Sequence, residues 1–381
     1  MIGRIFFLLL LLLGLAFADL LQNSDFETPP SNLAPNSTSP FRQLNETSSL
    51  FPGWSFQGTI FYVTTNQTTS LPDNGHAIQL AQDGKINQTF IPADYLHYLL
   101  TFTIAPSSQK CSDNTSIGIS GPDSHAIFSF KQNYVKETWE SYGIYLGSWE
   151  QQESINLIIE SQATESDTNS TCWPLIDMIL LKSLETLPPQ NNNLLLNGGF
   201  ELGPDFVINS SQGILLDAVS SPILSALRHW AIMGTVKYID SQHYMVPEGK
   251  AAIEIVSGVS AGIQAATTLK EGSAYSLEFT LGDANDSCEG NFLVGAQAGP
   301  TAQNFSLQSN GTGSAAKFSL PFKADSMTVS VSFVSYTTTQ TKDGVYCGPV
   351  IDNVILHAAY GIKSDIKWEV LIPLLFLVVI L

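Results

Sequence analysis

Two pairs of carboxylates are the residues of this 381-residue chain whose spacing most suggests a ligand site. Glu27 and Asp177 recur as Glu201 and Asp352, about 175 residues further along. Each pair falls at the first and last strands expected in its half of the chain, and such strands commonly lie side by side. Converging carboxylates with backbone carbonyls suit Ca²⁺, which takes six or more oxygen ligands. The pairs are therefore candidate Ca²⁺ ligands; the alternative is that they cap turns or pair with Lys and backbone N–H groups.

Four aromatic residues recur with the same spacing and are candidate carbohydrate-binding residues. Trp54 and Tyr62 correspond to Trp230 and Tyr238. Pyranose rings stack on flat aromatic faces, but the same side chains also fill protein cores. Core packing is the stronger explanation for the two Trp, because both recur beside β runs. The two Tyr fit either role.

A hydrolase motif is present, but its context is wrong. Residues 258–262 read GVSAG, and Asp352 and His357 follow in the order of a hydrolase triad. A nucleophile elbow needs a strand–turn–helix in an α/β sheet, and this chain shows no βαβ alternation. A glycan hydrolase would need a carboxylate pair in a cleft, which the sequence does not identify. We therefore predict no catalytic residue and no enzyme activity.

Two copies of one domain must position these residues. LLQNSDFE at 20–27 recurs as LLLNGGFE at 194–201, and Cys111 and Cys172 recur as Cys288 and Cys347. Short runs of period-two alternation, separated by Gly, Pro and Asn turns, predict strands, and no long amphipathic helix is present. The chain is therefore predicted to be all-β, with two tandem jelly-roll β-sandwich domains.

The repeat and the two chain ends set the expected boundaries. We expect a signal peptide at 1–18, a first β-sandwich at 19–186, a linker at 187–193, a second β-sandwich at 194–357 and a C-terminal signal with an apolar tail at 358–381. Arg4, an apolar run and the small residues before Asp19 are typical of secretion. The apolar end without basic flanks is typical of a GPI attachment signal, with a single-pass tail or a buried end as alternatives.

A secreted chain is expected to carry disulfides and glycans. Because each repeat holds two cysteines, we predict the bridges Cys111–Cys172 and Cys288–Cys347, although four cysteines allow three connectivities and metal thiolates are an alternative. N-x-Ser/Thr sequons predict glycosylation at Asn36, Asn45, Asn66, Asn87, Asn114, Asn169, Asn209, Asn285, Asn304 and Asn310.

The net charge of −18 restricts the partners. Nucleic acid, anionic lipid and polyanionic pectin would all be repelled by so acidic a chain. Neutral glycans are therefore the favoured glycan partners, and membrane contact is expected only through a GPI anchor or the C-terminal tail.

Several phrases resemble the plant cell-wall proteins of the domain-of-unknown-function 642 (DUF642) family. They are LLLNGGFELGP, VKYIDSQHYMVPEGKAAIEIV, LGDANDSCEG and CGPVIDNVIL. The resemblance covers nearly the whole mature chain and is strongest from 194 to 357. The first repeat departs from the family pattern, with CWPLID in place of CGPLID and NSDFE in place of NGNFE.

The resemblance implies tandem galactose-binding-like β-sandwiches in a secreted, non-catalytic protein of the cell wall or the outer face of the plasma membrane. It also implies polysaccharide binding and partnership with pectin methylesterase. Two hypotheses follow. The chain is a binding module for wall polysaccharide, or it is an adaptor that regulates a wall enzyme such as a pectin methylesterase.

Overall fold

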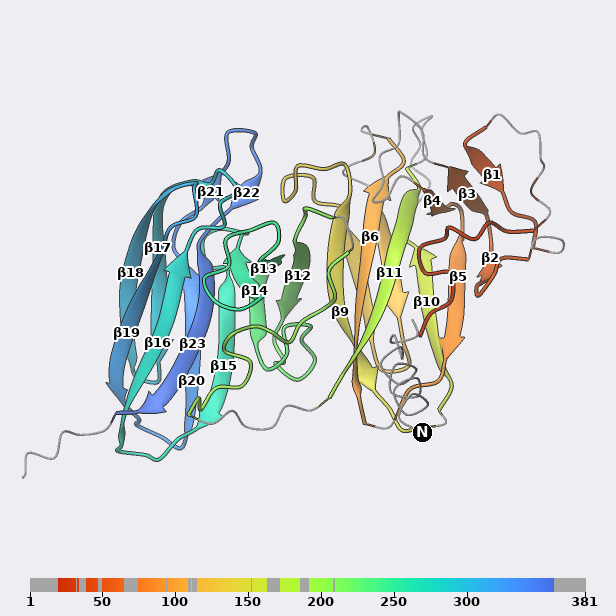
Figure 1. The fold of residues 1–381 in the computed structure, drawn as a ribbon. Coiled ribbons are helices and arrows are strands. Elements are labelled where there is room, and N and C mark those ends of the chain that lie inside the picture. The colour runs from red at the N-terminus through yellow and green to blue at the C-terminus, as the bar shows by residue number, and fades with distance from the viewer. Residues whose placement is uncertain are drawn as a thin grey trace, which may run out of the picture.

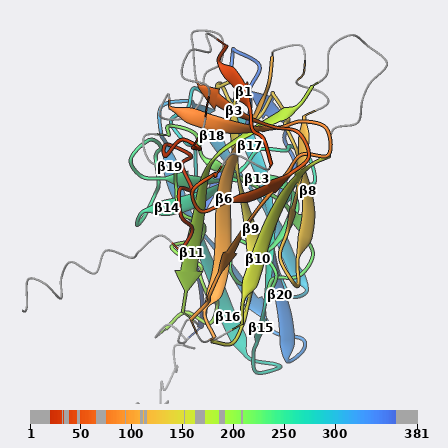
Figure 2. The ribbon, with the colours of Figure 1, turned by 90° about the vertical axis from the view of Figure 1, so that its right-hand side faces the viewer.

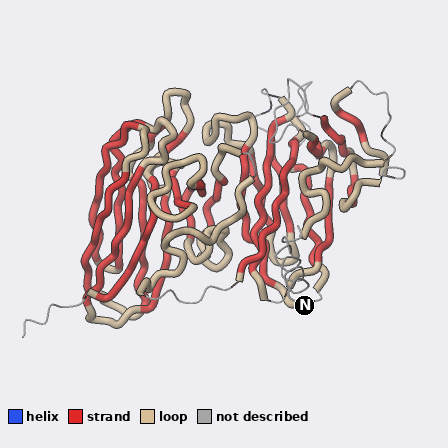
Figure 3. Tube along the Cα trace, in the orientation of Figure 1, coloured by secondary structure: helices blue, strands red, loops and turns tan. Residues whose placement is uncertain are grey.

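The computed structural model describes residues 20–359 apart from 32, 34–38, 47–49, 65–74, 94, 109–110, 112–114, 152, 163–171, 186–191 and 208–209. Within these residues the chain forms 23 strands and no α-helix (Figure 3). The strands build two β-sandwiches in tandem. The predicted fold class of two jelly-roll sandwiches is therefore confirmed.

The first sandwich packs two sheets on a shared apolar core. One sheet has the order β1-β3-β4-β11-β6-β9, and the other has the order β2-β5-β10-β7-β8. Ile78, Phe102 and Ile159 illustrate how inward-facing residues of both sheets meet in one buried cluster. The strands are β1 (Phe41–Gln43), β2 (Ser55–Gln57), β3 (Ile60–Thr64), β4 (His76–Leu80), β5 (Lys85–Phe90), β6 (His97–Pro106), β7 (Ser116–Ser120), β8 (His125–Ser129), β9 (Glu140–Ser148), β10 (Ile155–Ser161) and β11 (Pro174–Leu184).

The second sandwich repeats this plan with longer strands. One sheet has the order β12-β13-β14-β23-β16-β19, and the other runs from β13 through β15, β20 and β17 to β18. The strands are β12 (Ile214–Val219), β13 (Ala231–Asp240), β14 (Ala251–Ile255), β15 (Gly262–Thr268), β16 (Ala274–Gly282), β17 (Glu289–Ala298), β18 (Thr301–Asn310), β19 (Ala315–Lys323), β20 (Thr328–Ser335), β21 (Thr339–Gln340), β22 (Tyr346–Cys347) and β23 (Val350–Ala358).

A glycine bend marks the place where the chain changes sheets in both sandwiches. Gly58 and Gly234 have φ angles of +71° and +70°, which favour glycine. The residues before each glycine pair with β5 or β15, and those after it pair with β4 or β14. The two halves of β13 therefore correspond to β2 and β3 of the first sandwich.

The opening phrase of each repeat lies against the last strand of its own sandwich. The N–H of Ile179 donates to the carbonyl of Ser24 at 2.9 Å, and the N–H of Val354 donates to that of Gly198 at 2.8 Å. First and last segments therefore lie side by side, which is the geometry expected from the carboxylate pairs.

Both predicted disulfides are present, Cys111–Cys172 in the first sandwich and Cys288–Cys347 in the second. They span 61 and 59 residues of sequence. In the chain-entropy model, closing a loop of that length stabilises the folded state by at most about 4 kcal/mol. Each bridge joins two segments of its own domain that are far apart in the sequence.

A shared sheet joins the two sandwiches. β9 and β12 pair in parallel, Ser141 with Ile214 and Tyr142 with Leu215. A 16-stranded sheet therefore runs through both domains, and Figure 1 shows β9 and β12 as neighbours where the sandwiches meet. Figure 2 looks along the row from the first sandwich, with the second behind it. An ion pair of 2.8 Å between Lys182 and Asp205 adds a second link.

Candidate functional site

The repeated glutamates each close a turn. Glu27 Oε1 accepts the N–H of His76 at 2.6 Å, and Glu201 Oε1 accepts the N–H of Lys250 at 2.8 Å. A glycine precedes each donor, and a Cβ added at Gly249 would lie 1.9 Å from Glu201 Oε1. A glycine is required for the carboxylate to approach this closely. Each glutamate thus ties the opening phrase to the turn before β4 or β14.

The repeated aspartates are buried. Asp177 and Asp352 each accept the N–H of the following residue, at 2.7 and 2.6 Å. Asp352 also accepts the N–H of Glu248 at 2.8 Å. Burial, together with the nearby charges of Glu201 and Glu248, raises the pKa of Asp352 to about 7, against the effect of its two N–H donors.

These contacts are those of turn-capping carboxylates. In the part of the chain that the structure describes, no group of three or more His, Cys, Asp and Glu side chains is placed to hold a metal ion. Backbone carbonyls would have to complete the coordination of a Ca²⁺ ion. Ca²⁺ binding by Glu27 with Asp177, or by Glu201 with Asp352, stays a prediction.

The four repeated aromatics lie in the cores, as expected for the two Trp, and this corrects the alternative that they and the two Tyr are carbohydrate-binding residues. Trp54, Tyr62, Trp230 and Tyr238 are at most 5% exposed. In each sandwich the indole N–H donates at 3.1 Å, and the phenol O–H at 2.8 to 2.9 Å, to backbone carbonyls of the opening phrase. A ring without a free face cannot stack on a sugar. These residues instead anchor the opening phrase to the core.

The first four GVSAG residues lie in the loop between β14 and β15, and Gly262 begins β15, whereas a nucleophile elbow leads into a helix. The N–H of Ser260 donates to the carbonyl of Ser335 at 2.9 Å. His357 Nε2 contacts Glu278 Oε1 at 3.0 Å. Among the described residues, no hydrogen bond or ion pair joins Ser260 to His357 or to Asp352, so the structure shows no triad.

Half of the predicted glycosylation sites fall on described residues, and most of these are exposed. Asn45, Asn285, Asn304 and Asn310 are exposed, and Asn87 is half-buried. Asn36, Asn66, Asn114, Asn169 and Asn209 lie outside the described residues, as do the expected signal peptide and residues 360–381. Glycosylation and secretion stay predictions. No helix long and apolar enough to span a bilayer is found in the described residues.

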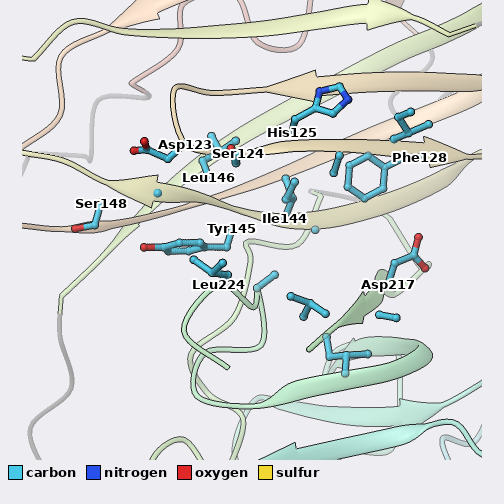
Figure 4. A pocket seen from close by; sticks show the side chains of 18 residues that line it. Asp123, Ser124, His125, Phe128, Ile144, Tyr145, Leu146, Ser148, Asp217 and Leu224 are labelled. Carbon is cyan, nitrogen blue, oxygen red and sulfur yellow. The ribbon is translucent and has the colours of Figure 1, made fainter. Parts of the chain in front are cut away.

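A cavity of about 570 Å³ lies between the sandwiches and is called the junction cavity below. Its volume is that of typical small-molecule sites. β8 and β9 form one wall, and residues between β12 and Ile232 form the other (Figure 4). Tyr145 faces Leu224 across the cavity, and Asp123 and Asp217 lie at opposite ends. The site is made by both domains, so neither repeat alone contains it.

The carboxylates of the junction cavity are partly engaged by the protein. Asp123 Oδ2 accepts the indole N–H of Trp149 at 2.8 Å. Asp217 Oδ1 accepts from Thr235 Oγ1 at 2.8 Å and forms an ion pair with Lys131. Within the described residues, no hydrogen bond reaches the second oxygen of either carboxylate. Each end of the cavity therefore keeps one acceptor free.

A second surface is formed by β15, β17, β18 and β20, and its outward side is called the uncharged face below. Glu289, at the start of β17, is the one charged residue of these four strands. Apolar side chains such as Phe292 and Val294 alternate towards the core. The outward positions carry amides and hydroxyls, namely Gln264, Asn291, Gln297, Asn304, Ser306, Gln308, Ser330 and Ser332.

Tyr336 lies on the uncharged face. It follows β20, and its N–H donates to the carbonyl of Leu293 at 2.8 Å. A Cβ added at Gly295 would lie 2.6 Å from ring atom Cε2 of Tyr336, so the ring rests against the glycine backbone. The residue is nevertheless 48% exposed. Neither this ring nor the junction cavity was singled out from the sequence, although the absence of charge along the four strands could be read there.

These features define an all-β protein of two tandem sandwiches, with one cavity between the domains and an uncharged sheet face on the second. Residues 19–182 and 193–357 each match the family described as "Protein of unknown function (DUF642)", and the chain belongs to this family. The family resemblance read from the opening phrases and the CGPVIDNVIL segment is therefore confirmed.

Relatives occur in Arabidopsis thaliana. "Protein DUF642 L-GALACTONO-1,4-LACTONE-RESPONSIVE GENE 2" is 30% identical over 347 residues, which cover 88% of this chain and 90% of the relative. "Protein TEEBE" is 30% identical over 349 residues, which cover 89% of this chain and 91% of the relative. Both relatives are thus matched along nearly their whole length.

Solved structures with weak likeness include carbohydrate-binding modules. The tandem CBM22-1–CBM22-2 domain from Paenibacillus barcinonensis Xyn10C is 11% identical with a TM-score of 0.28, covering 83% of this chain and 97% of that one. TmCBM61 in complex with β-1,4-galactotriose is 14% identical with a TM-score of 0.30, covering 44% of this chain and 99% of that one. At such scores, the ligand of this chain has to be argued from its own residues.

Proposed function

We propose that this protein is a secreted, non-catalytic binder of neutral cell-wall polysaccharide, and that the uncharged face holds the glycan. The observation that carries this proposal is the contrast in charge. The chain has a net charge of −18, yet the four strands of this face contain only Glu289 as a charged residue. A surface without charge favours a neutral ligand over a polyanion.

The side chains of the uncharged face suit sugar hydroxyls. Asn and Gln amides offer both donors and acceptors, and Ser hydroxyls do the same. Gln297 and Ser332 lie opposite each other on β17 and β20, and Ser332 lies opposite Gln264 on β15. A row of hydrogen-bonding groups therefore crosses three strands.

Tyr336 would supply the stacking contact. Gly295 supports one side of its ring, and close to half of the residue remains accessible. Gln297, two residues along β17 from Gly295, points to the same side of the sheet. A pyranose stacked on the free side of Tyr336 would have this amide within its surroundings.

The relatives come from a plant, and a place in the cell wall or on the outer face of the plasma membrane is part of this proposal. Attachment to that membrane would depend on a GPI anchor added within 358–381, most of which lies outside the described residues. In this proposal the protein touches lipid only through that anchor.

The test is affinity electrophoresis of the mature protein in gels that contain xyloglucan, β-1,4-galactan or polygalacturonate. We expect retardation by a neutral glycan and none by polygalacturonate. Tyr336→Ala should weaken the retardation about tenfold, because it removes the stacking face. Tyr95→Ala is the matched control, since Tyr95 is an exposed tyrosine of the first sandwich. Retardation that survives Tyr336→Ala, or that occurs only with polygalacturonate, would refute this assignment.

The second candidate function is an adaptor that regulates a wall enzyme, and the net charge of −18 is the observation that favours it. Complementary charge speeds and steers the association of an acidic protein with a basic one. A basic wall enzyme such as a pectin methylesterase would fit. Capture of such an enzyme from wall extract, lost at high salt and unaffected by Tyr336→Ala, would favour this function.

A further inference from the structure

We propose that the junction cavity binds a small, largely apolar molecule that is neutral or cationic. This site differs from the uncharged face in position and in chemistry. It lies between the domains, whereas the uncharged face belongs to the second sandwich alone.

Exposed apolar residues from both domains line the junction cavity. Ile127 on β8 is 56% exposed, and Leu224 in the loop after β12 is 57% exposed. Leaving two such side chains in water is unfavourable, and a ligand that covers both recovers that free energy. Apolar residues from two domains around one cavity mark a binding site rather than scattered surface residues.

The walls of the junction cavity are mainly apolar. Phe128 and Tyr145 lie on β8 and β9 and are only 4% and 8% exposed, and Tyr145 faces Leu224 across the space (Figure 4). The Arg228 guanidinium sits 4.7 Å from the centroid of the Tyr145 ring and holds that ring from outside the lining. The pairing of β9 with β12 fixes the distance between the walls. The cavity is therefore pre-formed, which lowers the entropic cost of binding.

The charges of the junction cavity exclude an anion. Asp123 and Asp217 are its carboxylates, and neither Lys nor Arg is among its lining residues. Two cations lie behind the lining, and both are engaged by the protein: Lys131 by Asp217 and by Thr235 Oγ1 at 2.9 Å, and Arg228 by the carbonyl of Ile223 at 2.6 Å. In the described part of the chain, no hydrogen bond occupies the second oxygen of either carboxylate. A ligand with a donor or a positive charge at its end matches this arrangement.

Two aromatic dyes of opposite charge test the proposal with the full-length mature protein. Thioflavin T is cationic, and 8-anilino-1-naphthalenesulfonate is anionic. We expect thioflavin T to bind with a stoichiometry of one, about tenfold more tightly than the anionic dye. Asp123→Asn should reduce this preference, while the indole of Trp149 keeps an oxygen to which it can donate.

Two neighbouring leucine and isoleucine positions give a matched pair of variants. Leu224→Ser should weaken thioflavin T binding about tenfold, because the side chain lines the cavity. Ile223→Ser should not, since Ile223 is similarly exposed but is absent from the lining. Equal binding to the Leu224→Ser variant and the unaltered protein, or a preference for the anionic dye, would overturn the proposal. Tyr336→Ala should leave dye binding unchanged, so failure here is distinguishable from failure of the glycan proposal.

Discussion

Lys237 and Glu254 form an ion pair of 3.1 Å inside the second sandwich, at the place where the first sandwich has Phe61 and Gln79. Lys237 lies opposite Glu254 on β13 and β14, just as Phe61 lies opposite Gln79 on β3 and β4. The two charged side chains are 4% and 0% exposed. The same pair of positions is therefore charged in the second sandwich and uncharged in the first.

Breaking this ion pair should destabilise the second sandwich. Lys237→Met leaves the Glu254 carboxylate buried without its counter-charge, and we expect a loss of about 3–5 kcal/mol in the free energy of unfolding. The double variant Lys237→Phe/Glu254→Gln copies the first sandwich and should lose less, because no unpaired charge remains. Urea unfolding measures both. Equal losses for the single and double variants would contradict this account. Lys342→Met, at an exposed pair, is the control and should have almost no effect.

Stability should fall as the pH rises, because of Glu140. This residue of β9 is completely buried. Its Oε2 accepts the N–H of Lys131 and the O–H of Tyr142, each at 2.8 Å, while its Oε1 has no partner among the residues that the structure describes. Burial raises the pKa of Glu140 from 4.5 to about 7. The folded state therefore holds a proton that the unfolded state has already released.

The sign follows from this raised pKa. The contribution of Glu140 to the free energy of unfolding is fully present below pH 4.5 and is lost as the pH rises through about 7. We expect the first sandwich to be less stable at pH 8 than at pH 5 by about 3 kcal/mol from this group alone. Glu140→Gln should flatten that dependence. Urea titrations at both pH values measure it, and an unchanged slope in Glu140→Gln would show that other groups are responsible.

Calcium binding at the second carboxylate pair predicts a higher melting temperature in calcium than in chelator, since a ligand bound only to the folded state stabilises it. Asp352→Asn should abolish the difference while keeping the shape of the side chain. Scanning calorimetry of the full chain, with elemental analysis of the purified protein, measures both effects. Superimposable melting curves and no bound metal would leave Glu201 and Asp352 as turn-capping carboxylates.

The apolar tail predicts release from membranes. A phosphatidylinositol-specific phospholipase should free the protein if 358–381 directs attachment of a GPI anchor. The measurement is immunoblotting of membrane and supernatant fractions before and after treatment. Retention in the membrane, with the tail peptide still detected by mass spectrometry, would instead support a single-pass tail.

The repeat predicts the core better than the ligand surfaces. Trp230 and Tyr238 recur because each repeat has to anchor its opening phrase, and their spacing therefore marks burial and not binding. The Cys pairs recur for the same structural reason. Tyr336 has no such marker, since the matching position in the first repeat is Gln162, which lies against Gly118 as Tyr336 lies against Gly295. A binding residue found in one copy only is invisible to an argument based on repetition.

The junction cavity could not be predicted from the sequence either, but for a different reason. Its walls come from two domains, and their approach depends on the pairing of β9 with β12. Alternation along β9 predicts which residues face a core, but it does not state which strand of another domain will be its neighbour. Ile127 and Leu224 look like ordinary surface residues until both domains are in place.

The parallel pairing of β9 with β12 also determines where the long sheet can grow. Two of its edge strands are poor templates for another chain, since β1 has three residues and β19 carries Pro321 between Lys317 and Lys323. β9 has neither proline nor lysine along its length. If the first sandwich were produced alone, β9 would therefore be an exposed edge strand to which a strand of another molecule could add. The second sandwich pairs with part of that edge, at Ser141 and Tyr142, and so makes strand addition to the first sandwich less favourable.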